Sequence, residues 1–226
     1  MANGKQPARK QFPKAEREAQ ILAAAFKEFA ANGYAAARLD DVAKRAKIAK
    51  GTIFLHFRDK KALFRAVLCS LIRPPRPTSE GELQNSQSTS ESLLRELLAH
   101  MYSQVVENKK ARALIRLLIA ESEKFPELAE IYYQEIIAPG TSAIGLLVEK
   151  GVASGEFRAS DVRRFPQIVV APGVLAVMWV LLLGENRLDL EGYRAVYLDF
   201  VMRGLRAPAA ENASQAAARV VSGGPS

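Results

Sequence analysis

The stretch Leu39–Phe57, with the sequence LDDVAKRAKIAKGTIFLHF, predicts two short helices separated by a tight turn. Its first half repeats apolar residues at i, i+3, i+4 and i+7, the spacing of one buried helix face: Leu39, Val42, Ala43 and Ala46. After a break at residues 47–49, a second helix begins at Lys50 and directs Ile53 and Phe57 inward. Two short helices across a tight turn are typical of the helix-turn-helix, whose second helix enters the major groove of DNA.

The other side chains of the second helix are not needed for a core, so they are candidates for contact with DNA. Gly51 lies at the start of this helix, where a missing side chain allows the backbone to approach a phosphate closely. Lys50 and Thr52 are candidates for contact with base edges or with adjacent phosphates, and the pattern leaves both possibilities open. The outward set is completed by Phe54, Leu55 and His56.

This segment and its neighbours resemble the tetracycline-repressor (TetR) family of one-component regulators. The resemblance spans residues 14–65 and rests on these positions: Ile21, Leu22, Ala24, Ala25, Phe29, Gly33, Tyr34, Val42, Ala43, Gly51, Thr52, Ile53, Phe54, His56, Phe57, Lys60 and Leu63. It implies three N-terminal helices that bind operator DNA, followed by a variable helical domain that dimerises and binds a small effector. It also implies that Lys60, at the start of the next helix, contacts a phosphate. We add Arg38, at the start of the motif, to the candidate DNA-binding residues.

Three positions depart from the pattern that the family usually shows. Ala37-Arg38 stands where Thr or Ser is common, and Ala49 stands where a Ser commonly caps the second helix. Loss of such a capping side chain costs about 1 kcal/mol of helix stability. Phe54 replaces a common Tyr and therefore lacks a hydroxyl that could donate to a phosphate. These departures concern individual contacts and leave the resemblance intact.

The charge of the chain is concentrated in the part that carries the motif. The formal net charge is +8, yet residues 1–65 hold 15 Lys and Arg against 6 Asp and Glu, whereas residues 66–226 hold 17 against 18. A basic segment of this kind suits a polyanionic partner such as DNA. The single cysteine, Cys69, excludes an internal disulfide, fits a reducing cytoplasm and is expected to be a packed core thiol rather than a redox switch. The N-terminus lacks the apolar run of a signal peptide.

The rest of the chain predicts helices and no strand, which makes the fold class all-α. We expect a flexible basic arm at residues 1–12, the DNA-binding domain at 13–58, a helical effector-binding and dimerisation domain at 59–206, and a disordered tail at 207–226. Residues 74–90 are rich in Pro and Ser and predict a linker, followed by a capping box at Ser88-x-x-Glu91. Gly33 is expected to end the first helix, Asp59 to cap the fourth, and Pro139 to break a helix.

One apolar segment, residues 165–183, could be mistaken for a membrane span. Its uncharged part, Ile168–Leu183, has 16 residues, fewer than the ~20 that a span needs, and Pro172-Gly173 interrupts it. A helix that is apolar on most faces is better explained by burial against its own core and a partner subunit. In the resembled family the last two helices of each subunit form a four-helix dimer interface. We therefore expect a homodimer that does not use a membrane, with Trp179 buried.

The chemistry expected of this chain is binding rather than catalysis. No Gly-rich phosphate loop and no Cys or His cluster with metal-ligand spacing occurs, so we expect no catalytic residue, no metal and no cofactor. His100 is expected to be an ordinary surface or core residue. Candidates to line a helical effector pocket, each of which is also explained as ordinary core, favour an apolar or aromatic ligand: Met101, Tyr102, Leu118, Phe125, Tyr132, Tyr133, Ile136, Met178 and Trp179.

These observations predict a cytoplasmic, homodimeric transcriptional regulator that binds double-stranded operator DNA. Two recognition helices ~34–36 Å apart would read a palindromic operator, and a small molecule that favours another spacing would release it. The preferred hypothesis is a repressor, and an activator of the same fold is equally compatible with the sequence. Two further alternatives remain: a ligand-independent or architectural DNA-binding protein, and a helical enzyme or carrier that retains a vestigial motif.

Overall fold

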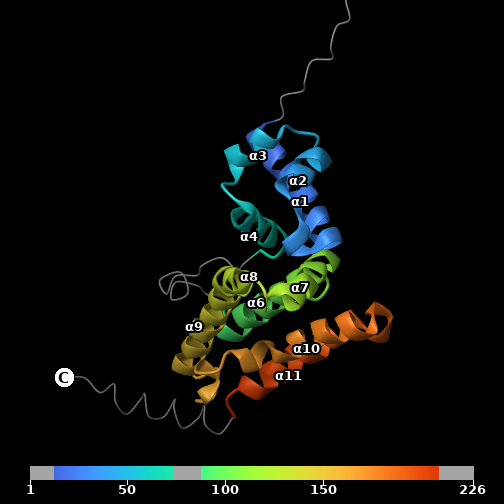
Figure 1. The fold of residues 1–226 in the computed structure, drawn as a ribbon. Helices are drawn as coiled ribbons and strands as arrows, with labels where there is room; N and C mark the ends of the chain where they lie inside the picture. Colours follow the sequence, from blue (N-terminus) through green and yellow to red (C-terminus); the bar gives the residue numbers. More distant parts are fainter. Residues whose placement is uncertain (1–12, 74–87, 209–226) are drawn as a thin grey trace, which may run out of the picture. The chain divides into compact units, whose positions relative to one another are not determined.

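The computed structural model describes residues 13–73 and 88–208 of the chain. In these two stretches the chain is helical and contains no strand (Figure 1). Its extended pairing there is limited to an isolated bridge between Phe157 and Arg206. The predicted all-α fold class is therefore confirmed. The expected arm, most of the expected linker, and the expected tail beyond residue 208 lie outside the described residues.

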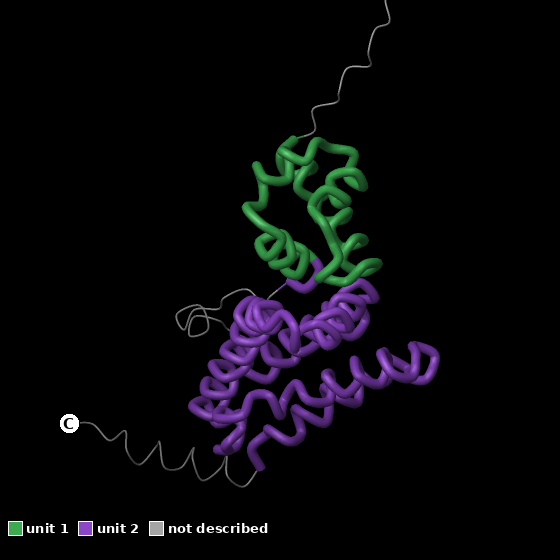
Figure 2. Tube along the Cα trace, in the orientation of Figure 1, with its two compact units in different colours: residues 1–70 green, residues 71–226 purple. Residues whose placement is uncertain are grey.

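The chain divides into two compact units, residues 1–70 and residues 71–226 (Figure 2). Unit 1 contains four helices: α1 (Lys14–Ala36), α2 (Leu39–Ala46), α3 (Lys50–His56) and α4 (Lys60–Leu71). The division falls near the end of α4, beyond the domain boundary that we placed at residue 58. Helix α4 begins with a cap as expected, because Asp59 Oδ1 accepts a hydrogen bond of 2.7 Å from the backbone N–H of Ala62. Cys69 of α4 is half-buried.

The core of unit 1 is built around three aromatic rings that come from α1 and α4. Phe29 and Phe64 pack edge to face with centroids 5.4 Å apart, and Tyr34 lies 5.5 Å from Phe64 and 5.9 Å from Phe29. Tyr34 can return to this cluster because Gly33, with φ of 73°, turns the chain at the end of the long regular part of α1. The predicted helix end at Gly33 thus corresponds to a real break, after which one more turn continues to Ala36.

A buried carboxylate fastens α1 to α2. Glu28 is 3% exposed, and its Oε2 lies 3.1 Å from Arg45 of α2, while its Oε1 accepts a hydrogen bond of 2.6 Å from Asn32. Both oxygens of the buried carboxylate therefore have donors, which is the condition for tolerating a charge in the interior.

The described residues of unit 2 form these helical elements: α6 (Ser90–Val105), α7 (Lys109–Glu121), α8 (Pro126–Tyr132), η1 (Tyr133–Ile137), α9 (Ala138–Ser154), η2 (Asp161–Arg163), α10 (Gln167–Leu183), η3 (Glu185–Arg187) and α11 (Leu190–Leu205). Helix α6 packs against α7, α9, α10 and α11, so it is the central helix of this unit. The N-cap of α6 is Thr89, whose side chain accepts from the backbone N–H of Ser92 at 3.1 Å. The capping box predicted at Ser88-x-x-Glu91 is therefore wrong, and a single cap hydrogen bond to Thr89, one residue later, begins the helix.

Two prolines that we expected to interrupt helices lie within helical segments instead. Before Pro139 the chain forms a π-helical turn, in which the N–H of Ala138 bonds to the carbonyl of Tyr133, and the helix then continues as α9. Because proline has no N–H to donate, the regular hydrogen-bond pattern is interrupted at Pro139, and the wider π-helical turn lets the helix continue past it. Pro172 lies inside α10, where tyrosines of α11 donate to nearby carbonyls: Tyr193 to Pro172 O at 2.9 Å and Tyr197 to Val169 O at 3.0 Å.

Because Pro139 does not break the helix, α8, η1 and α9 form one stretch, Pro126–Ser154, of 29 residues. Within the described residues it alone reaches the length and apolar composition of a membrane span, with 39% of its apolar window buried. The core helix of a soluble protein meets the same criterion, so this is weak evidence for a span. The segment that we singled out from the sequence is α10, which at 17 residues is shorter.

Candidate DNA-binding site and effector region

The turn between α2 and α3 sets the position of the outward helix. Val42 and Ala43 bury the inner face of α2, and Lys47 then adopts a left-handed conformation with φ of 56°. This conformation costs a residue with a side chain about 1 kcal/mol. In return the N–H of Lys47 bonds to the carbonyl groups at the end of α2, and the N–H of Ile48 bonds to Ala43 O at 3.0 Å. The predicted helix-turn-helix is thus present.

Helix α3 separates its apolar residues sharply between inside and outside. Ile53 is fully buried and Phe57, just after the helix, is 7% exposed, as predicted. Phe54 and Leu55 are 47% and 84% exposed. Ala49 occupies the N-cap without a side-chain hydrogen bond, as its sequence implies. The interior thus holds α3 through one face, and its other face is free for a partner.

Gly51 has no role in the packing of this helix. A Cβ built on it would meet no other atom within 4 Å, and its backbone is helical rather than left-handed. The fold therefore does not require glycine here, although glycine in a helix costs about 1 kcal/mol relative to alanine. The backbone at this position is therefore open to a partner that approaches from outside the chain.

The charge of Lys50 is shared with the preceding helix. Its Nζ lies 2.7 Å from Oδ1 and 3.1 Å from Oδ2 of Asp40, in the first turn of α2. Both side chains are about half exposed, and such a pair contributes about 0–1 kcal/mol to stability. Its greater effect is to orient the ammonium group. The sequence did not point to Asp40 as part of the site, because a contact between residues ten positions apart has no signal in helical periodicity.

The ammonium group of Lys60 is surrounded by carbonyl groups from the end of α1. Nζ donates to Tyr34 O at 2.7 Å, to Ala35 O at 3.1 Å and to Ala37 O at 3.3 Å, and it lies 4.5 Å from the centre of the Tyr34 ring. A lysine in this position satisfies the last carbonyls of a helix and interacts favourably with its dipole.

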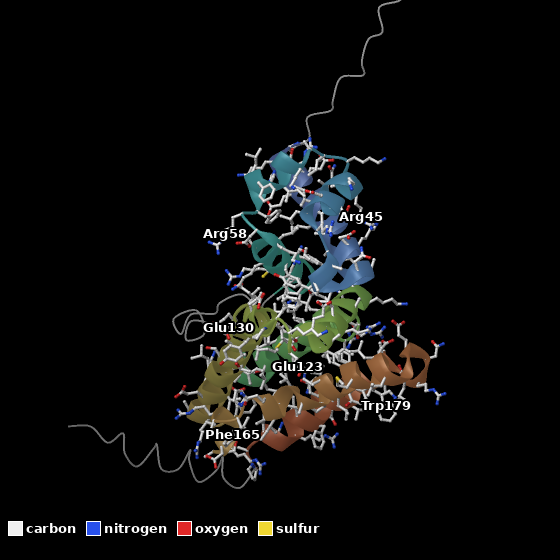
Figure 3. All side chains as sticks on the ribbon, in the orientation of Figure 1. Arg45, Arg58, Glu123, Glu130, Phe165 and Trp179 are labelled. Carbon is white, nitrogen blue, oxygen red and sulfur yellow. The ribbon has the colours of Figure 1, made fainter. Side chains whose placement is uncertain are left out.

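The other candidates lie near α3 with different degrees of exposure. Arg38 is exposed and is the N-cap residue of α2. Its carbonyl oxygen accepts hydrogen bonds from the backbone N–H groups of Asp41 and Val42. Thr52 and His56 are half-buried. Arg58, labelled in Figure 3, has a side chain that is 84% exposed and pairs with Asp59 at 3.0 Å. We did not include Arg58 among the candidates, although its position directly after α3 was a usable signal.

The candidates for an effector pocket do not share one environment. Tyr102, Leu118 and Ile136 are buried, and Met101 approaches α9 so closely that a Cβ on Gly140 would lie 3.0 Å from its Cε. The half-buried candidates are Met101, Phe125, Tyr132 and Met178. Tyr133 and Trp179 are 52% and 43% exposed. Trp179 is labelled on α10 in Figure 3. The sequence predicts burial of Trp179 against a partner subunit in the homodimer, so its exposure in the single chain leaves that burial a prediction.

Three tyrosines form the polar part of the interior of unit 2. The ring of Tyr102 lies 6.0 Å from Tyr197 and 6.4 Å from Tyr193, and its hydroxyl donates to Leu190 O at 3.1 Å. Burial, together with the nearby carboxylate of Glu107, raises the pKa of Tyr102 to about 12. Burial also raises the pKa of Tyr197 and of Tyr193. All three hydroxyls are therefore neutral donors at physiological pH.

A charged cluster fastens the turn between α6 and α7 to the turn between α10 and α11. Arg112 is 3% exposed and donates to Val106 O and to the carboxylate of Glu185. Lys109 Nζ lies 2.9 Å from the same carboxylate, and hydrogen bonds from Lys109 and then Arg112 lower the pKa of Glu185. None of the described residues forms a cluster of His, Cys, Asp and Glu that could hold a metal ion.

In a comparison with known proteins, each of the two units matches a family model. Residues 21–67 match the model for bacterial regulatory proteins of the tetR family, and residues 89–191 match that for the tetracyclin repressor-like C-terminal domain. The HTH-type transcriptional regulator TtgR of Pseudomonas putida is 30% identical over 154 residues, which are 64% of this chain and 71% of TtgR.

Solved structures show the same fold at lower identity. NalD of Pseudomonas aeruginosa, the secondary repressor of the MexAB-OprM multidrug efflux pump, has a TM-score of 0.66 and 18% identity, covering 86% of this chain and 98% of NalD. FadR of Bacillus subtilis, solved in complex with stearoyl-CoA, has a TM-score of 0.61 and 23% identity, covering 82% of this chain and 98% of FadR.

Proposed function

Because this chain belongs to the TetR family of helix-turn-helix transcriptional regulators, we propose that it is a homodimeric repressor released from a palindromic operator by a small molecule. The observation that carries the proposal is the outward face of α3, which the core of unit 1 leaves open. The candidate residues for DNA contact are those around this face: Arg38, Lys50, Gly51, Thr52, Phe54, Leu55, His56 and Lys60.

The exposed face of α10 and α11 supports the dimer. Ile168, Leu175, Trp179 and Leu182 recur on α10 at i, i+7, i+11 and i+14, so they share one side of the helix, and each is at least 43% exposed. On α11, Val196 and Phe200 are 70% and 71% exposed. Exposed apolar side chains on two helices that pack against each other support a protein interface, and two copies related by a two-fold axis would cover them symmetrically.

A dimer formed through this face of α10 and α11 would also explain recognition of a palindrome. A two-fold dimer presents two α3 helices, and these fit successive major grooves when they lie ~34–36 Å apart. Helix α4 continues from Lys60 in unit 1 to Leu71 in unit 2, so a change of conformation in unit 2 has a direct route to α3. A ligand that binds better to a conformation with another spacing then lowers the affinity for DNA.

We infer that the effector is apolar or aromatic and binds within the helices of unit 2. The tyrosine cluster of Tyr102, Tyr193 and Tyr197 supports this, because it places aromatic rings and hydroxyl groups between α6, α10 and α11. The neutral hydroxyls of the tyrosine cluster offer a few polar contacts among apolar side chains, the usual composition of a ligand site. Binding to chromosomal DNA and the presence of a single cysteine both fit a cytoplasmic protein.

A footprint of the purified protein on the DNA upstream of its own gene tests the proposal. We expect two protected half-sites related by two-fold symmetry, with an affinity well above that for random DNA of the same length. Addition of effector candidates should release this DNA and leave the dimer intact. Protection without sequence preference would support an architectural protein instead, and ligand-enhanced transcription from the site would support an activator.

A further inference from the structure

The surface of unit 1 exposes apolar side chains at one place. Over residues 13–70, which the structure describes, Phe54 and Leu55 are the only large apolar side chains that are exposed, at 47% and 84%. All other large apolar side chains in this range are buried or half-buried. Both exceptions are neighbours on α3, which is the helix that the family places in the DNA groove.

Leu55 lies on the side of α3 that faces directly away from the core of unit 1. Successive residues of a helix are rotated by about 100°, so Leu55, two positions after Ile53, points almost directly away from it. Ile53 is fully buried, which fixes the inner side of the helix and therefore the outer side as well. When α3 enters a groove, Leu55 reaches the floor of the groove, while Thr52 and Phe54 face its two walls.

Gly51 leaves the outer side of α3 beside Leu55 without a side chain. It lies one turn before Leu55 on the same side of α3, and a Cβ on it would meet nothing within 4 Å of the chain itself. The bare backbone beside Leu55 therefore lets the helix approach the base pairs closely enough for a short apolar side chain to touch them. A bulky neighbour at position 51 would hold Leu55 away from the bases.

An aliphatic side chain can recognise only one group in the major groove. The other base-edge groups are hydrogen-bond donors or acceptors, and covering one with Leu55 would remove its water without replacing the hydrogen bond. The C5-methyl group of thymine is apolar and gains from the same contact. We propose that Leu55 is a specificity-determining residue that reads a thymine methyl group in each operator half-site, an inference that rests on the proposed DNA-binding function.

The test removes this methyl group alone. Duplexes selected by the purified full-length protein from a random pool are resynthesised with deoxyuridine at each thymine of the half-site in turn, which preserves every hydrogen bond of the base pair. At one thymine per half-site we expect about a fourfold loss of affinity, the effect of one buried methyl group. The variant Leu55→Ala should bind the thymine and uracil duplexes equally well. This variant should fold normally, because the replaced side chain is on the surface and alanine favours a helix.

A matched variant separates loss of methyl recognition from a general loss of affinity. Arg38→Ala, also on the exposed surface of unit 1, should weaken binding to both duplexes by the same factor and keep the fourfold difference between them. The inference is overturned if the wild-type protein tolerates uracil at every position, or if Leu55→Ala retains the difference. Failure to select any duplex from the pool would instead reject the proposed DNA-binding function.

Discussion

The ammonium group of Lys50 lies 2.7 Å from the carboxylate of Asp40, so a residue of α2 holds the first side chain of α3 in place. Lys50 is thus oriented but also partly neutralised before DNA arrives. The pair has to rearrange, or to remain intact beside the phosphates, when the complex forms. Whether the pair rearranges or stays intact determines how strongly the affinity for DNA depends on salt concentration.

Replacement of Asp40 by Asn should increase the affinity for random duplex DNA and make the log-affinity against log-salt slope steeper by up to about 1, because Lys50 then neutralises a phosphate fully. Fluorescence anisotropy with labelled duplex at several salt concentrations measures both quantities. Asp41→Asn is the matched control, since it removes a neighbouring charge that pairs with Lys44 at 3.1 Å and leaves Lys50 untouched. Equal slopes for the two variants would show that the Asp40–Lys50 pair does not restrain Lys50.

Replacement of Lys60 by Ala should destabilise unit 1, because three carbonyl groups at the end of α1 lose their donor. We expect a loss of about 1–3 kcal/mol in the free energy of unfolding, the usual range for a hydrogen-bonded charge. Urea unfolding followed by circular dichroism measures it, with Lys61→Ala, at an exposed neighbour, as the control.

The salt dependence of DNA binding by the same Lys60 variant tests the phosphate contact that the family resemblance implies. A slope flattened by about 1 relative to the wild-type protein shows that the ammonium group binds a phosphate in the complex. An unchanged slope shows that Lys60 acts only by holding the end of α1. Either outcome is independent of the stability measurement.

Replacement of Leu182 by Asp should give monomers that bind operator DNA weakly. Leu182 is 75% exposed in the single chain, so a charge there costs little in folding, whereas in the proposed interface it is desolvated without a partner. Analytical ultracentrifugation measures the association. Ile119→Asp, a similar change at an apolar residue of α7 that is 56% exposed, should leave the dimer intact. A normal dimer from the Leu182 variant contradicts the interface proposal.

The fluorescence of Trp179 should report the same association. In the single chain its side chain is 43% exposed, and it lies on the face of α10 that also carries Leu182. We expect blue-shifted emission and weak quenching by iodide at concentrations where the wild-type protein is dimeric. The Leu182→Asp variant should emit further to the red and be quenched strongly. Strong quenching of the wild-type dimer would place Trp179 outside the interface.

The stability of unit 2 should fall as the pH rises from about 10 to about 12. Burial raises the pKa of Tyr102 to about 12, above the value of 10 for a free tyrosine. Between these values the unfolded chain loses this proton while the folded chain keeps it, so alkaline pH favours unfolding. Urea unfolding across this range measures the loss, which should be smaller for Tyr102→Phe. At neutral pH this variant should be about 1 kcal/mol less stable, because the bond to Leu190 O is lost.

The sequence by itself determined the helical fold and the location of the DNA-binding motif. The spacing of Leu39, Val42, Ala43 and Ala46 is a local property, and so is the burial of Ile53 and Phe57, because the rotation of a helix converts position along the chain directly into position around its axis. The cap at Asp59 and the turn at Gly33 depend on their immediate neighbours in the same way.

Only the tertiary structure decided which side chains meet across helices. The pairing of Lys50 with Asp40, and the three carbonyls around Lys60, depend on how α1, α2, α3 and α4 pack, which no periodicity encodes. The continuity of the helix through Pro139 was mispredicted, and the exposure of Trp179 in the single chain leaves open, until the dimer is tested, which surface covers it. Apolar composition says that a side chain prefers burial but not which surface covers it, and a proline ends a helix only where the surrounding backbone cannot widen to accommodate it.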